Sequence, residues 1–181
     1  MSIKAFAFVL AVLALTGQAS AATAPAKAAQ KPAAAKPAAG GFDARDPTSL
    51  IALLATMGAK GEILRTADGE VFMKVATPSF DFNAQYVGCD GKGRSCEGLA
   101  FSTTSSQRST TLAQLNSFNQ TSLTCRVFED QAGKPHVMYS TLVSAADTRE
   151  EMRTHIGVWQ GCLSTFGLFL ADPIGYLASA P

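Results

Sequence analysis

Two cysteines bracket a short segment rich in glycine and charge, "CDGKGRSC", which runs from Cys89 to Cys96. Cysteine thiolates bind metals, carry out redox chemistry or form disulfides, and glycine-rich loops hold phosphate groups. Six residues separate these cysteines, whereas zinc knuckles have about two to four between their ligands. A phosphate loop leads into a helix, but the residues after Cys96 have the pattern of a strand, and Lys92 is not followed by Ser or Thr. Neither a metal site nor a nucleotide site is therefore indicated.

The other residues with catalytic potential do not form a recognisable set. His136 starts a predicted strand beside Pro135 and is expected to be a solvated turn residue. His155 borders the buried face of a helix, which favours a hydrogen-bonded structural role. The Ser- and Thr-rich segment 102–111 lacks the Gly-x-Ser-x-Gly pattern of a nucleophile elbow. A Cys-x-x-Cys pair is absent and the acidic residues are scattered. We predict no catalytic, cofactor-binding or metal-binding residues, and no enzymatic activity.

The first 21 residues have the features of an export signal in the usual order. Lys4 precedes an apolar run, residues 5–17, and the small residues Ala19-Ser20-Ala21 follow it. The run is shorter than the roughly 20 apolar residues that a membrane span needs. We predict export to the periplasm or the exterior, cleavage near Ala21 or Ala22, and no membrane span afterwards.

Composition divides the remaining chain into a tether and one domain. Residues 22–41 contain only Ala, Pro, Lys, Gln, Thr and Gly, which cannot form a core and predict a flexible tether. The chain has 15 Lys and Arg, and four precede residue 42, so the segment 42–181 has 11 against 14 Asp and Glu. A weakly acidic segment argues against nucleic acid as a partner. Its length is typical of a single domain.

Export would place the four cysteines in an oxidising compartment, where disulfides form. Facing residues of an antiparallel hairpin have Cα atoms as close as about 4.5 Å, so a disulfide is the favoured interpretation of Cys89 and Cys96. Cys125 lies on a predicted strand face, and Cys162 lies near the buried face of the last helix. If that helix covers the sheet, the two meet. A second disulfide and two buried thiols both remain open for this pair.

Hydrophobic periodicity and turn signals predict three helices and six strands. The helices are 46–58 with Asp46 as cap, 109–120 with Ser109 as cap, and 147–172, which Asp147 or Thr148 caps and Pro173 ends. The strands are 61–66, 70–76, 79–89, 96–104, 122–130 and 136–145. Asp68 and Gly69 favour a hairpin turn between the first two strands. In the fifth strand, Leu123, Cys125 and Val127 are expected to share a buried face. The order α-ββββ-α-ββ-α lacks βαβ alternation and predicts an α+β fold with a mostly antiparallel sheet packed against helices.

Several of these segments resemble the YbjN-domain family of bacterial proteins. The resemblance covers about residues 46–170 and rests on "YVGCDGKGRSCEGLAFST", on "LAQLNSFNQ" before "LTCRVFEDQAGKPHVMYSTLV", and on "VWQGCLSTF". The family motif corresponds to Asn116, Phe118, Asn119, Trp159 and Phe166, although the family more often has Trp where Phe118 stands.

The resemblance implies a fold similar to type III secretion chaperones, frequent self-association, and the family label of sensory transduction regulator, with no catalytic residues. The export signal argues against a type III role, because such chaperones act before export.

Three functions are compatible with these observations. We favour an exported, non-enzymatic protein-interaction module, chaperone-like or regulatory, that binds a protein or peptide at a sheet edge or a helix groove. One alternative is a small-ligand-binding protein or enzyme with a pocket between the sheet and the last helix. The other is a regulator that responds to redox conditions through a disulfide.

Overall fold

The computed structural model describes residues 41–107 and 110–180. The predicted signal peptide, the predicted tether up to residue 40, and Ser109 lie outside these residues.

The described residues form an α+β fold, as predicted. The elements along the chain are α1 (Pro47–Thr56), β1 (Lys60–Ala67), β2 (Glu70–Ala76), β3 (Asp81–Val87), β4 (Gly98–Thr104), α2 (Leu112–Thr121), β5 (Arg126–Glu129), β6 (Pro135–Leu142), α3 (Arg149–Ala171) and α4 (Pro173–Ser179).

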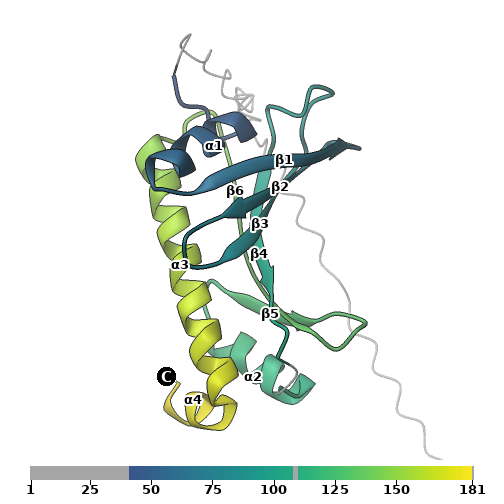
Figure 1. Ribbon diagram of the computed structural model, residues 1–181, viewed down its shortest axis with the longest axis vertical. Helices are drawn as coiled ribbons and strands as arrows, with labels where there is room; N and C mark the ends of the chain where they lie inside the picture. Colours follow the sequence, from purple (N-terminus) through teal and green to yellow (C-terminus); the bar gives the residue numbers. More distant parts are fainter. Residues whose placement is uncertain (1–40, 108–109, 181) are drawn as a thin grey trace, which may run out of the picture. The chain divides into compact units, whose positions relative to one another are not determined.

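The strands form one antiparallel sheet in the order β1-β2-β3-β4-β6-β5. β6 pairs with β4, so β5 lies at the edge although it precedes β6 in the sequence. In this order, β1 and β5 are the two edge strands. The long helix α3 runs along one face of the sheet, with α1 near one end of α3 and with α2 and α4 near its other end (Figure 1).

Local interactions explain where several elements begin and turn. Asp46 accepts a hydrogen bond from the Thr48 amide as the N-cap of α1. Asp68 and Gly69 both have positive φ, which lets the chain reverse between β1 and β2. Thr148 and Glu151 form a capping box at the start of α3. These positions match the sequence-based expectations.

Aromatic side chains of the sheet and α3 fill the core. In β3 the buried residues alternate with exposed ones, and Phe82, Ala84 and Tyr86 face the helices. The indole of Trp159 on α3 lies against the rings of Phe82 and Phe101, with ring centroids 5.7 and 6.0 Å apart. This cluster joins the middle of α3 to the central strands.

Two local predictions were wrong, and one helix was not predicted. Pro173 follows the end of α3, as expected, but it also begins the unpredicted α4, because Asp172 caps the new helix and accepts a hydrogen bond from the Gly175 amide. The N-cap of α2 is Thr111, which forms a capping box with Gln114. Leu123 is 93% exposed, because β5 begins only at Arg126 and the residues before it form a turn.

Among the described residues, no single helix has both the length and the apolarity of a membrane span; α3 and α4 meet that test only together, with a bend of 119° between them.

Candidate functional site

A disulfide joins Cys89 and Cys96, whose Cα atoms are 3.8 Å apart. These residues follow β3 and precede β4, and their amides bond to other segments. The Cys89 amide donates to the Gly69 carbonyl in the turn between β1 and β2, and the Cys96 amide donates to the Arg45 carbonyl before α1. The loop therefore connects the turn between β1 and β2 to the segment that leads into α1.

Asp90 organises the residues inside this loop. Its carboxylate accepts hydrogen bonds from the Lys92 and Arg94 amides, and its carbonyl accepts one from Gly93, which has positive φ. The amide bonds, that of Arg94 first, lower the pKa of Asp90. Gly93 is also required because a Cβ there would lie 2.9 Å from Thr66 Cγ2. The glycine and charge in "CDGKGRSC" thus build a turn.

The loop between β5 and β6 has the same hydrogen-bond pattern without a disulfide. Asp130 accepts from the amides of Ala132, Lys134 and, through its carbonyl, Gly133. The Lys134 amide is the main cause that lowers the pKa of Asp130, and a hydrogen bond from His136 adds to it. The pattern Asp-x-x-Gly with a basic residue next is therefore a turn signal in this chain, and it carries no chemistry by itself.

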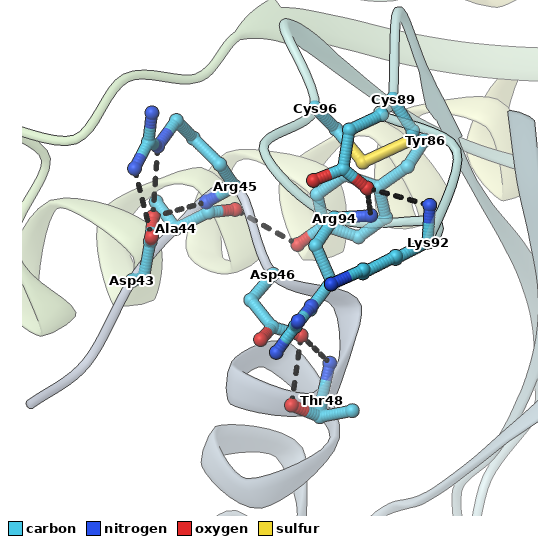
Figure 2. The surroundings of a disulfide bond; sticks show 11 residues. Asp43, Ala44, Arg45, Asp46, Thr48, Tyr86, Cys89, Lys92, Arg94 and Cys96 are labelled. Carbon is cyan, nitrogen blue, oxygen red and sulfur yellow. Dashed lines mark hydrogen bonds and ion pairs between the residues drawn. A yellow bond between two sulfur atoms is a disulfide. The ribbon is translucent and has the colours of Figure 1, made fainter. Parts of the chain in front are cut away.

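The segment before α1 is also held by Tyr86, which lies near the end of β3. The buried Tyr86 hydroxyl donates to the Ala44 carbonyl over 3.1 Å, and burial, reinforced by the nearby Asp46 and Asp43 carboxylates, raises the pKa of Tyr86 (Figure 2). Arg45 forms a bidentate ion pair with Asp43 at 3.0–3.1 Å, and these hydrogen bonds lower the pKa of the Asp43 carboxyl. These contacts hold the segment in place.

A second disulfide joins Cys125 and Cys162, 37 residues apart in the sequence. Cys125 immediately precedes β5, and Cys162 lies on the buried face of α3. The sequence left open whether these cysteines form a disulfide or remain as two buried thiols, and the structure has the disulfide. It ties the edge strand β5 to the helix that covers the sheet.

Asn119 closes the outer edge of β5. Its amide group donates to the Val127 carbonyl at 2.9 Å, and its carbonyl accepts from the Val127 amide at 2.8 Å. The side chain of a helix residue thus makes the two bonds that a neighbouring strand would make. Asn116 is exposed and makes no side-chain hydrogen bond to the described residues.

The remaining motif residues belong to the core. Phe118 is fully buried, with its ring centroid 5.0 Å from that of Phe169 and 5.7 Å from that of Tyr176 on α4. Trp159 is fully buried and Phe166 is 4% exposed, both on α3. The motif therefore positions α2, α3 and α4, and only Asn119 acts on the edge of the sheet.

The outer edge of β1 is open. β1 pairs only with β2, and no other described residue hydrogen-bonds to its backbone. Residues 62–66 are all exposed, including the apolar Ile63 and Leu64, at 40% and 59%. The pairing register shifts between Ile63 and Arg65, which makes Leu64 the extra residue of a β-bulge. In the sequence "GEILRT", the adjacent apolar residues Ile63 and Leu64 interrupt the alternation of a regular strand. This interruption was the sequence signal from which the bulge could have been predicted.

Neither histidine is at an obvious catalytic centre. His136 lies at the start of β6, as predicted, but it is half-buried and not solvated: it contacts Thr104 at 2.8 Å and Asp130 at 3.2 Å, and stacks on Phe128. These contacts tie the turn after β5 to β4. His155 is half-buried and hydrogen-bonded to Tyr139 at 2.5 Å, which matches the expected structural role. Among the described residues, no three His, Cys, Asp or Glu gather as a metal-binding group would.

The comparison with protein-family models identifies one family. The model described as "YbjN: Putative bacterial sensory transduction regulator" matches residues 46–170, which is more than half of the chain. The chain belongs to the YbjN family. The match begins at the N-cap of α1 and ends in the last turn of α3, so it includes both disulfides and both edge strands. A comparison with curated proteins gives no match.

Proposed function

We propose that this YbjN-family protein is an exported, non-enzymatic interaction module of the bacterial envelope that holds an extended segment of a partner protein. The observation that carries the proposal is the open edge of β1, in a sheet whose other edge is closed by Asn119. The family description as a sensory transduction regulator supports a regulatory role.

The backbone groups and side chains at the edge of β1 indicate what kind of partner segment would bind there. An edge strand has a row of unpaired N–H and C=O groups, which an extended segment satisfies by adding a strand. Ile63 and Leu64 add exposed apolar side chains that can contact alternate apolar residues of that segment. The bulge at Leu64 interrupts the regular ladder, which limits indiscriminate pairing and restricts binding to segments that fit the extra residue.

A site-specific cross-linker tests the position of binding. A photoreactive phenylalanine analogue in place of Leu64 should form cross-links to one defined segment of one envelope protein, identified by mass spectrometry. The matched control has the analogue in place of Phe128, which is 43% exposed on the closed edge strand β5. Equal cross-linking from both positions, or none from position 64 while a partner copurifies, would overturn binding at β1.

The proposed domain organisation has its own test. We propose that residues 1–21 are a signal peptide, residues 22–41 a tether and residues 42–181 the domain. Fractionation of cells that express the full chain should place it outside the cytoplasm, with a mature N-terminus near Ala22 by mass measurement. A protein that keeps residues 1–21 and stays in the cytoplasm would contradict export.

We propose that both disulfides are structural, rather than sensors of redox conditions. Cys96, Cys125 and Cys162 are 0%, 5% and 1% exposed, and Cys89 is half-buried. A reductant therefore has limited access while the protein is folded. Alkylation under mild reductant should leave all four cysteines unmodified until the protein unfolds. Reversible reduction in the folded protein would favour the redox-responsive alternative.

A further inference from the structure

The open strand β1 has three charged side chains, all of them exposed, which follow one another as Lys60, Glu62 and Arg65. In the pairing register they face Ala76, Lys74 and Phe72 of β2, in that order. These residues of β2 alternate with its buried residues, so the three charges of β1 lie on the face of the sheet away from the helices. A positive, a negative and a positive side chain thus form a row along the uncovered face of the open edge.

Two contacts agree with this placement. The Arg65 guanidinium carbon lies 4.1 Å from the centre of the Phe72 ring, and Lys74 forms an ion pair at 3.1 Å with Asp81 of β3. Lys74 therefore bonds to Asp81 and not to Glu62, which it faces across the strands. No described residue forms an ion pair or a side-chain hydrogen bond with any of the three charged groups of β1. They are thus available to a binding partner.

Charges on an edge strand select the segments that can pair with it. In an added strand, the residues directly opposite β1 would have Cβ atoms about 5 Å away. Opposite charges at facing positions stabilise the pairing of two strands, whereas like charges oppose it. Charged side chains on an edge also deter association with segments that do not match them. The row on β1 therefore favours a segment of complementary charge over all others.

The bulge in β1 determines how the complementary charges are spaced. Glu62 and Arg65 are three positions apart because Leu64 is the extra residue, but the β2 residues that face them, Lys74 and Phe72, are two positions apart. A regular strand on the outer side of β1 spans the same length, so its matching residues are also two positions apart. The order positive, negative, positive is the same in both directions. The complement is therefore negative, positive, negative for a parallel or an antiparallel segment.

We infer that the partner segment has the pattern acid-x-base-x-acid, in which each acid is Asp or Glu, the base is Lys or Arg, and x is apolar. The base faces Glu62, and the acids face Lys60 and Arg65. The x residues point to the covered face, on the side of Ile63, which is 40% exposed. This inference rests on the proposed binding at β1 and adds the chemistry that selects the partner.

Three fluorescently labelled peptides test the charge pattern by anisotropy. The complementary peptide Thr-Val-Asp-Val-Lys-Val-Asp-Val-Thr should bind about ten-fold more tightly than Thr-Val-Lys-Val-Asp-Val-Lys-Val-Thr or Thr-Val-Asp-Val-Asp-Val-Asp-Val-Thr. Non-specific attraction would favour the peptide with two lysines, because acidic residues outnumber basic ones in the segment 42–181. Equal affinity of the three peptides, or tightest binding of the peptide with two lysines, would overturn the inference.

A charge reversal at the centre of the row provides the second test. Glu62→Lys should transfer the preference to the peptide with three aspartates, because a lysine then faces its central position. The matched control, Glu129→Lys, reverses an exposed charge on the closed edge strand β5 and should keep the preference of the parent chain. An unchanged preference in Glu62→Lys would contradict the assigned facing residues.

Cross-linking from the photoreactive analogue at position 64 separates this inference from the proposed function. If all three peptides cross-link there with equal affinity, binding at β1 stands and the charge pattern is refuted. If no peptide binds, the envelope segment cross-linked from position 64 decides: a segment with the pattern supports the inference and a segment without it refutes it. If nothing cross-links from position 64, both proposals fail.

Discussion

β1 and β5 each pair with a single neighbouring strand, but their outer edges differ. Asn119 makes two hydrogen bonds to the Val127 backbone, and the Cys125–Cys162 disulfide fastens the start of β5 to α3. β1 has a bulge and exposed apolar side chains, with no equivalent cover among the described residues. An open edge tends to aggregate, so natural sheets usually protect it. The contrast supports the proposal that a partner binds at β1, because β5 is already held by contacts within the protein.

Removal of the Cys125–Cys162 disulfide is expected to lower the stability of the protein more than any other change proposed here. Replacing Cys125 and Cys162 with alanine should lower the free energy of unfolding by about 4 kcal/mol, because the disulfide closes a loop of 37 residues. The same change at Cys89 and Cys96, seven residues apart, should cost about 2.5 kcal/mol. Urea unfolding of both double variants measures the difference. A larger loss of stability in the Cys89 and Cys96 variant would contradict the prediction that the Cys125–Cys162 disulfide stabilises the fold more.

Asn119→Ala should have the next largest effect. The substitution removes both bonds to Val127 and leaves a part-buried N–H and C=O unpaired, which should cost about 2 kcal/mol. Asn116→Ala on the same helix is the matched control and should change stability by less than about 0.5 kcal/mol. The same unfolding series compares them, and similar losses for the two variants would show that Asn119 does not hold the edge.

Leu64→Lys should affect binding without affecting stability. Leu64 is 59% exposed, so its replacement should change the free energy of unfolding by less than about 0.5 kcal/mol. A lysine on an edge strand opposes pairing, so cross-linking from the neighbouring position 63 should be lost. Leu123→Lys, at an exposed leucine before β5, should leave cross-linking unchanged. If Leu64→Lys and Leu123→Lys both abolished cross-linking, binding of the partner would not be specific to the edge of β1.

The smallest effect concerns Asp130 in the turn after β5, and its pH dependence lies in the acid range. The pKa of Asp130 is lowered in the folded protein, so its charged form contributes stability above the ordinary carboxyl pKa of 3.8. This contribution is lost as the pH falls through the lowered folded value. Thermal unfolding below about pH 4 should therefore be less pH-dependent in Asp130→Asn than in the parent chain. Identical pH profiles would mean that Asp130 does not stabilise the turn through its charge.

Features encoded by neighbouring residues could be predicted from the sequence. The cap at Asp46, the turn at Asp68 and Gly69, and the alternation in β3 each depend on interactions within a few residues. The Cys89–Cys96 pairing also followed from local geometry, because the two residues flank one hairpin loop. Leu123 and the start of β5 were placed wrongly, since an apolar residue beside a strand is not distinguished from one inside it.

Other features depended on segments far apart in the chain. β6 pairs with β4 and leaves β5 at the edge, and no local pattern encodes that choice. Only packing of α3 on the sheet brings Cys162 to Cys125, and only the edge position of β5 gives Asn119 its two bonds to Val127. The sequence by itself determined the elements and the local disulfide, because short-range sterics and hydrogen bonds specify them. The tertiary structure decided which edge is closed and which is open, because that depends on which buried faces meet.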